Sequence, residues 1–198
     1  GDVGSGKTVV AGLVARQASQ SGLQTALLAP TEILASQHAK TLADLLEPHG
    51  VSVALLTGSV KPAARRGLLN ALANGDIDII IGTHALLQDS VNFHKLGLVI
   101  IDEQHRFGVK QRQALIDKSP KMPHLLSMTA TPIPRSLALT LYGELDISIL
   151  DELPAGRQPI TTKLWSPAST PAMYELVDRE ISNGRQVYLI CPLIDDSE

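Results

Sequence analysis

The sequence predicts an α/β fold in which a parallel β-sheet carries helices on both faces. Short runs rich in Leu, Ile and Val alternate with segments whose apolar residues recur every three or four positions, as in repeated βα units. Hydrophobic residues make up 44% of the 198 residues and aromatic residues only 3%, which is typical of the aliphatic core of a buried parallel sheet. A chain of this length can bury a sizeable core.

Each predicted strand is short and aliphatic, and each predicted helix lies between two strands. Thr31 is placed to cap the second helix and Pro48 to stop it, while Gly22, Gly75 and Gly143 stand where other helices should end. The predicted strands cover residues 24–29, 51–57, 77–81, 96–101, 124–127 and 146–150, and the other helices 7–21, 62–74, 110–118 and 134–141.

Residues 1–150 are predicted to form one domain, and a second domain is expected to begin near residue 161. The connector, residues 151–160, contains two prolines and a glycine, as exposed linkers between domains do. A strand at 161–165, a helix at 171–183 and a strand at 186–191 then predict the first βαβ unit of a second domain that is truncated at residue 198.

Composition restricts the compartment and the class of partner. The one cysteine, Cys191, permits no intramolecular disulfide, and the longest apolar runs fall far short of the roughly 18 residues that span a bilayer. No leader segment opens the chain, so we expect a cytoplasmic protein with no membrane partner. The formal net charge of -3 argues mildly against nucleic acid, although backbone N–H groups, helix N-termini and a few cations can also bind DNA.

Residues 1–8 read GDVGSGKT and match the phosphate-binding loop pattern in full. In such a loop the glycines let backbone N–H groups surround phosphate oxygens, Lys7 reaches the β and γ phosphates, and the Thr8 hydroxyl holds Mg²⁺. The strand that should precede the loop is missing, so we interpret the chain as a fragment. The predicted nucleotide-binding residues are Gly1, Asp2, Val3, Gly4, Ser5, Gly6, Lys7 and Thr8.

Two carboxylates follow directly on a buried strand in LGLVIIDEQH, residues 96–105. The carboxyl end of a parallel strand lies on the edge where open α/β folds bind ligands, the same edge as the phosphate loop. Asp102 can therefore hold Mg²⁺, and Glu103 can orient or deprotonate an attacking water. The alternative is that both residues simply end a strand.

The quartet DEQH at 102–105 and SMTATP at 127–132 resemble the ordered motifs of superfamily 2 helicases and translocases. The resemblance implies a RecA-like phosphate-loop fold with the start of a second RecA-like lobe, and ATP with Mg²⁺ as the ligands. It assigns catalysis to Lys7, Asp102, Glu103 and His105. Coupling of hydrolysis to lobe movement is assigned to Gln104, Thr129, Ala130 and Thr131.

Longer stretches resemble the RecG family of ATP-dependent DNA helicases along essentially the whole chain. These are APTEILASQH (29–38), GTHALLQ (82–88), DEQHRFGVKQR (102–112), TATPIPRSLALTLYGELD (129–146) and DELPAGRQPITT (151–162). The resemblance implies branch migration of stalled replication forks and Holliday junctions in DNA recombination and repair. Motors of the transcription-repair coupling type share HRFGV and TATPIPR, but Gln104 and the connector favour RecG. A catalytically silent nucleotide-binding fragment is the other alternative, and we expect little hydrolysis from residues 1–198 alone.

The same resemblance implies branched DNA as the partner of a monomeric motor, with single-stranded DNA-binding protein as a further partner. Thr31 stands at a helix N-terminus, whose free N–H groups suit a phosphate. Short Thr and Gly loops also cap helices in every α/β protein, which is the competing interpretation. The histidines share no spacing with Cys191 that would build a metal cluster, so Mg²⁺ is the one metal implied. The residues expected to face DNA are Pro30, Thr31, Glu32, Thr57, Gly58, Thr83 and His84.

Overall fold

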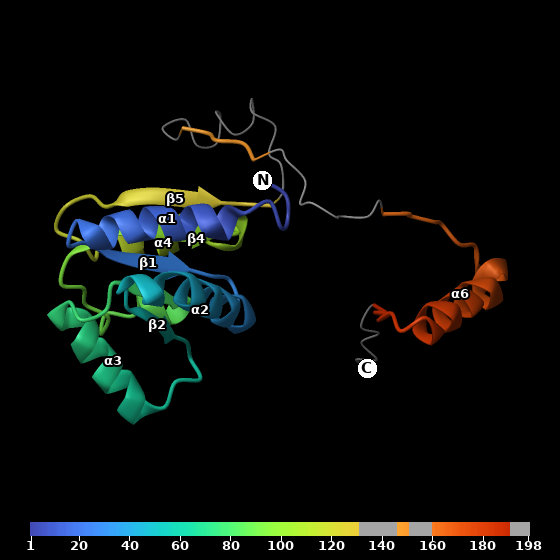
Figure 1. Ribbon diagram of the computed structural model, residues 1–198, viewed down its shortest axis with the longest axis horizontal. Coiled ribbons are helices and arrows are strands. Elements are labelled where there is room, and N and C mark those ends of the chain that lie inside the picture. The colour runs from blue at the N-terminus through green and yellow to red at the C-terminus, as the bar shows by residue number, and fades with distance from the viewer. Residues whose placement is uncertain (131–145, 151–159, 191–198) are drawn as a thin grey trace, which may run out of the picture. The chain divides into compact units, whose positions relative to one another are not determined.

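The computed structural model describes residues 1–130, 146–150 and 160–190, and the chain divides into two compact units (Figure 1). The first unit is Gly1–Gly156 and the second is Arg157–Glu198. None of the helices within the described residues is long and apolar enough to cross a membrane.

The first unit is built on a five-stranded parallel sheet whose strand order is β2-β3-β1-β4-β5. The first five predicted strands are confirmed, with bounds that differ by up to two residues at an end. The strands are β1 (Gln24–Leu28), β2 (Val53–Leu56), β3 (Ile79–Gly82), β4 (Leu96–Asp102) and β5 (His124–Met128). The helices are α1 (Lys7–Gln20), α2 (Glu32–Leu46), α3 (Pro62–Asn74) and α4 (Val109–Ile116), with short 3₁₀ turns η1 (Glu47–His49), η2 (His84–Leu87) and η3 (Gln104–Arg106).

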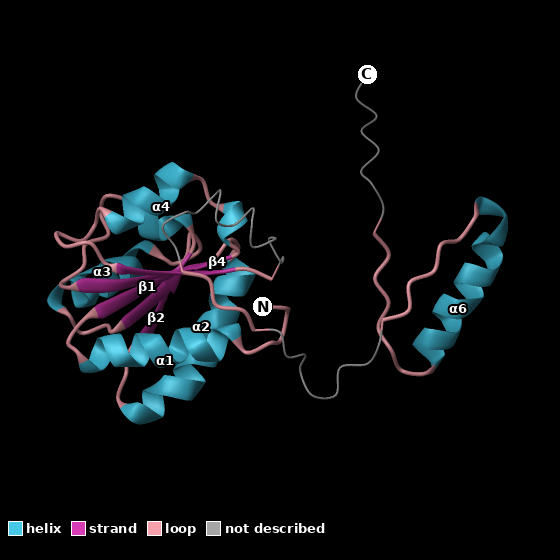
Figure 2. Cartoon of the chain, turned by 90° about the horizontal axis from the view of Figure 1, so that it is seen from above, coloured by secondary structure: helices cyan, strands magenta, loops and turns pink. Residues whose placement is uncertain are grey.

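Helices cover both faces of this sheet, as predicted (Figure 2). Because successive strand residues point to opposite faces, Leu28 of β1 joins the core under α3 and α4, while Leu27 joins the core under α1 and α2. The central strand β1 is buried along its whole length. The two aliphatic cores therefore hold the sheet rigid between the helix layers.

Local signals set the helix ends where the sequence predicted them. The Thr31 hydroxyl accepts a hydrogen bond from the Leu34 N–H at 3.3 Å and caps α2. Gly22 and Gly75 adopt left-handed φ angles of 69° and 89° just beyond α1 and α3. Pro48 lies in η1, immediately after α2. The predicted helix at 134–141 and Gly143 lie outside the described residues.

Three predicted strands are wrong in the part of the chain that the structure describes. Residues 146–150 are exposed and form no strand, and neither 161–165 nor 186–190 is a strand. The second unit contains η4 (Pro167–Ser169) and α6 (Thr170–Ser182), which has no buried residue. A strand requires the N–H and C=O groups of a neighbouring strand, and these segments pair with none among the described residues. Cys191, the last residue of the third segment, lies outside the description.

The carboxyl ends of the five strands lie level with one another. In the sheet register Leu28 stands opposite both Gly82 and Ile101. Leu56 stands opposite Gly82, and Asp102 opposite Met128. A Cβ at Gly82 would come within 2.2 Å of the Leu56 carbonyl oxygen, so glycine permits this close approach. The loops that leave the five strands therefore start from a single edge.

Candidate functional site

Most of the predicted site residues lie on this carboxyl edge, and the strand order sorts them into two halves. The β2-β3-β1 half carries the residues predicted to face DNA, and the β4-β5 half carries the acidic and coupling residues. In the chain every residue of the first set precedes every residue of the second, and the sheet places the two sets next to each other along one edge. The β2-β3-β1 half presents Thr57, Gly58, Thr83, His84, Pro30, Thr31 and Glu32, and the β4-β5 half presents Asp102, Glu103, Gln104, His105, Thr129 and Ala130.

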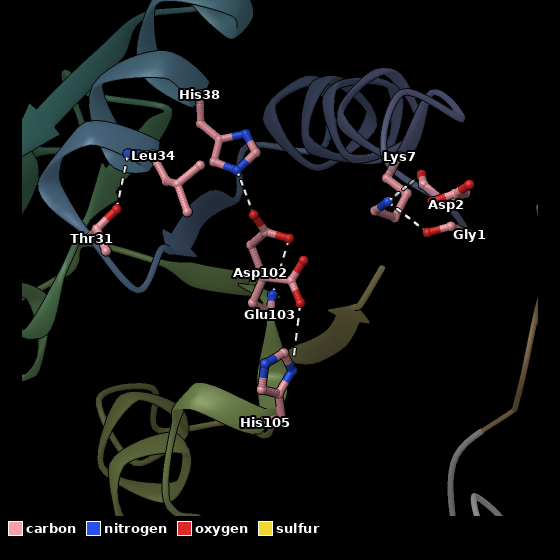
Figure 3. A network of polar contacts seen from close by, with 9 residues as sticks. All are labelled: Gly1, Asp2, Lys7, Thr31, Leu34, His38, Asp102, Glu103 and His105. Atoms are coloured by element: carbon pink, nitrogen blue, oxygen red, sulfur yellow. Dashed lines mark hydrogen bonds and ion pairs between the residues drawn. The ribbon is translucent and has the colours of Figure 1, made fainter. Parts of the chain in front are cut away.

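The phosphate loop ends directly at the N-terminus of α1. Gly4 and Gly6 adopt left-handed φ angles of 82° and 92°, which turn the backbone into the first turn of the helix. The first N–H groups of a helix have no intrahelical partner and point out of its end. Lys7 begins α1, and its Nζ donates to the carbonyl oxygens of Gly1 and Asp2, each at 2.7 Å (Figure 3). The ammonium group thus lies over the loop itself.

The loop adjoins the end of β5, where the Thr-Ala-Thr segment begins. The main-chain nitrogen of Gly1 donates to the Thr129 carbonyl oxygen at 3.3 Å. Ser5 has a buried Oγ with no hydrogen-bond partner among the described residues. Thr129 and Ala130 are half-buried, whereas Thr131 lies outside the described residues. The structure therefore joins two motifs that are 128 residues apart in the chain.

Asp102 ends β4 as a buried carboxylate whose two oxygens both accept hydrogen bonds (Figure 3). Its Oδ2 lies 2.8 Å from Nε2 of His38, and its Oδ1 accepts the Glu103 N–H at 3.0 Å. A carboxylate offers about four lone-pair sites in all. Each oxygen therefore keeps capacity for a further ligand.

Glu103 has an unusual backbone and a more open environment than its neighbour. Its φ of 48° and ψ of 56° are left-handed, and it is the one non-glycine residue with positive φ in the part of the chain that is described. Such a conformation costs about 1 kcal/mol or more and is found preferentially at functional sites. The carboxylate is half-buried, and its Oε2 lies 3.5 Å from Nδ1 of His105. Gln104 is buried, and its Nε2 has no partner among the described residues.

His38 is a site residue that the sequence analysis missed. In the sequence it is the last residue of APTEILASQH, and its spacing to Cys191 and to the other histidines indicates no metal site. The signal that could have identified it is its position in the buried stripe of α2, which otherwise contains Ala35, Leu42 and Leu46. A polar side chain in an apolar stripe requires a buried partner, because an unpaired buried polar group is costly. That partner comes from β4, 64 residues away in the chain.

The residues predicted to face DNA differ in how much of each side chain is accessible. Thr31, Glu32, Gly58 and His84 are exposed. Thr57 and Thr83 are buried, and the Thr57 Oγ1 lies 2.8 Å from the Ser59 hydroxyl. At these two positions, therefore, the side chain is turned into the protein.

A ring contact joins the β3 loop to the segment that follows β4. The His84 ring lies 5.6 Å from the ring of Phe107, tilted by 47°. The loop after η2 is held by Lys118, whose Nζ donates to the carbonyl oxygens of Gln88 and Val91. Burial lowers the pKa of Lys118, while the nearby Asp89 carboxylate raises it. The ring contact thus joins two loops of the carboxyl edge, whereas Lys118 holds the segment that leads back to the start of β4.

Comparisons with known proteins agree with the resemblance predicted from the motifs. The DEAD/DEAH box helicase family model matches residues 1–140. The chain is 56% identical over its full length to the ATP-dependent DNA helicase RecG of Synechocystis sp., covering 24% of that protein. It is 55% identical over its full length to the protein of the same name from Bacillus subtilis, covering 29% of it.

Solved structures agree with the fold. A RecG bound to a three-way DNA junction matches 98% of this chain with a TM-score of 0.83 and 46% identity, over 26% of that chain. The helicase MrfA bound to DNA, 18% identical over 69% of this chain with a TM-score of 0.54, shares the fold alone. The sheet is thus the RecA-like helicase fold, and the chain spans about a quarter of the length of the curated relatives it matches.

Proposed function

Since the chain belongs to the DEAD/DEAH box helicase family, we propose that it is the ATP-binding part of the motor of a RecG-type DNA helicase. Such a motor couples ATP hydrolysis to branch migration of stalled replication forks and Holliday junctions, in DNA recombination and repair. The observation that carries the proposal is the level carboxyl edge, where the phosphate loop contacts Thr129 and the carboxylates end the adjacent strand. Identity to RecG proteins along the whole chain supports the RecG branch.

The loop residues would bind the triphosphate of ATP. Lys7 would exchange its two carbonyl contacts for the β and γ phosphates, since phosphate oxygens carry more negative charge than carbonyl oxygens. Glu103 would orient the attacking water and accept its proton, because its carboxylate directly follows the end of β4 and is only half-buried, so that water can reach it. His105, 3.5 Å from Glu103, would hold that carboxylate in place.

Mg²⁺ fits the donor set at this edge. It prefers hard oxygen ligands, and it is usually held by one or two carboxylates together with substrate phosphates. Asp102 keeps lone-pair capacity on both oxygens, and the Thr8 hydroxyl lies in the first turn of α1. The ion would neutralise phosphate charge; Thr8 and Asp102 would hold it there.

The residues near the phosphate loop and the end of β5 would couple ATP hydrolysis to movement of the lobes. Thr129 already contacts Gly1, so movement at the loop would reach the Thr-Ala-Thr segment directly. Gln104 would contribute through its buried side-chain amide, whose Nε2 has no hydrogen-bond partner among the described residues and can donate to a new one. The proposed coupling set is Gln104, Thr129, Ala130 and Thr131.

Branched DNA is the proposed partner of the β2-β3-β1 half. Exposed positions such as Thr31 and His84 could contact phosphates with their side chains, whereas Thr57 and Thr83 would use their backbone. The N-terminus of α2 adds N–H groups and a positive dipole to this surface. We further propose residues 1–150 as the first motor lobe, residues 151–160 as the connector and residues 161–198 as the start of the second lobe.

The test is ATP-dependent unwinding of a labelled model fork by the full-length protein. Lys7→Ala should abolish unwinding while the thermal unfolding midpoint changes little, because the two hydrogen bonds that it removes lie within the phosphate loop and not in the core. Lys121→Ala, at an exposed lysine before β5, is the matched control and should unwind normally. Unwinding by Lys7→Ala at the parent rate would refute the proposal. Equal stimulation of hydrolysis by forks and by linear duplex would instead favour a transcription-repair type translocase.

A further inference from the structure

We propose that His38 is a positioning residue for Asp102, and that it ties the orientation of this carboxylate to helix α2. The inference deepens the proposed function and rests on it, because it concerns the Mg²⁺ site of the same motor. Its observation is the buried contact of 2.8 Å between His38 Nε2 and Asp102 Oδ2 (Figure 3).

The contact has a defined direction. An ionised carboxylate only accepts hydrogen bonds, so Nε2 of His38 carries the hydrogen and donates it. The second oxygen of Asp102 is held by the Glu103 N–H at 3.0 Å. Two donors from two different elements, α2 and the end of β4, therefore fix the plane of the carboxylate. Because the plane of the carboxylate is fixed, the directions of the remaining lone pairs on the two Asp102 oxygens are fixed as well.

Burial protects the hydrogen bond between His38 and Asp102 from competition by water. The exposed fraction is 7% for Asp102 and 9% for His38, so water does not readily replace either partner. Outer partners of metal-binding carboxylates orient the ligand, and their loss typically lowers metal affinity 10- to 100-fold. His38 would thus act on Mg²⁺ through Asp102 and not by binding the ion.

Helix α2 links this contact to the half of the edge that is proposed to bind DNA. His38 lies seven residues after Thr31, about two helical turns, and therefore on the same side of the helix. Thr31 and Glu32 form the exposed start of α2. A rigid helix transmits a shift of its first turn to His38, so DNA bound at Thr31 would change how firmly Asp102 is held. Strand β1, which leads into α2, pairs with β4 along its length.

The first experiment measures metal binding directly in the full-length protein. Mn²⁺ serves as the probe for Mg²⁺, and its affinity is read by electron paramagnetic resonance with a non-hydrolysable ATP analogue present. His38→Ala should weaken Mn²⁺ binding about tenfold or more. His38→Gln should restore most of the affinity, since the amide nitrogen can donate from a position close to that of Nε2. His49→Ala, at an exposed histidine in η1, is the matched control and should bind Mn²⁺ normally.

A double-mutant cycle separates positioning from a general loss of structure. If His38 acts only through Asp102, then His38→Ala should add little to the loss of Mn²⁺ affinity already caused by Asp102→Asn. Fully additive losses would overturn the proposal, as would unchanged Mn²⁺ affinity in His38→Ala. Should His38→Ala unfold, His38→Gln decides: a loss of affinity as great as that of Asp102→Asn in this folded variant would also overturn it.

The link to DNA has its own readout. The ratio of ATP hydrolysis with and without fork DNA should fall in His38→Ala at saturating Mg²⁺, while it stays near the parent value in His38→Gln and in His49→Ala. An unchanged ratio in His38→Ala would overturn the link through α2. Failure of the unmodified protein to hydrolyse ATP at all would instead refute the proposed function, so the two failures are distinguishable.

Discussion

The two halves of the carboxyl edge use the same fold in different ways. The β4-β5 half holds a buried carboxylate with both oxygens bonded, a neighbouring glutamate in a left-handed conformation and a contact with the phosphate loop. The β2-β3-β1 half offers short polar loops and a helix N-terminus. The buried carboxylate and the left-handed backbone of Glu103 thus both belong to the β4-β5 half, where hydrolysis is proposed. The β2-β3-β1 half, which is proposed to bind DNA, offers backbone groups and exposed side chains.

This difference suggests that the two halves can be separated by mutation. Changes in the β4-β5 half should alter hydrolysis in the absence of DNA, because they affect groups next to the phosphates. Changes in the β2-β3-β1 half should leave hydrolysis without DNA unchanged and alter the response to DNA. His38 is the exception expected to affect both, because it lies on α2 and contacts β4.

The largest effect is expected at the paired carboxylates. Glu103→Gln should retain Mg-ATP while hydrolysis falls about 100-fold or more, since a positioned general base contributes on this scale. Asp102→Asn should instead weaken Mg²⁺ binding, because the amide has lost the negative charge. Steady-state hydrolysis across a Mg²⁺ titration distinguishes the two variants. Undiminished hydrolysis in both variants would show that the β4-β5 half takes no part in ATP hydrolysis.

An intermediate effect is expected from the Thr-Ala-Thr segment. Thr129→Ala combined with Thr131→Ala should leave hydrolysis measurable but reduce fork unwinding disproportionately, because Thr129 lies between the loop and the end of β5. The quantity to measure is the number of base pairs unwound per ATP hydrolysed. If unwinding and hydrolysis fall in step, these residues serve hydrolysis or stability and not coupling.

The smallest effect is expected at Thr31. Thr31→Ala removes the cap of α2 and should cost about 1 kcal/mol of unfolding free energy, together with a modest loss of DNA affinity. Thr31→Ser keeps a hydroxyl that can cap the helix and should behave like the parent. Urea unfolding and fluorescence anisotropy with a labelled fork provide the two measurements. Parent-like stability and affinity in Thr31→Ala would show that this helix end has neither role.

Several features of the site could be read from residues that are close together in the chain. The phosphate loop is eight consecutive residues, and the acidic pair directly follows an aliphatic strand. Thr31, Gly22 and Gly75 set helix ends because a helix forms its hydrogen bonds within a single segment. The His38 contact could not be read in this way, because its partner lies on another element.

The sequence by itself determined the α/β class, the phosphate loop, the acidic pair and the ends of the helices. Only the tertiary structure decided the strand order, which places the two sets of motifs on the two halves of one edge, the burial of Thr57 and Thr83, and the pairing of His38 with Asp102. It also decided that residues 146–150, 161–165 and 186–190 form no strand. The physical reason is that a strand, like a buried charge, is stabilised by groups from elsewhere in the chain, and a local pattern does not specify which groups those are.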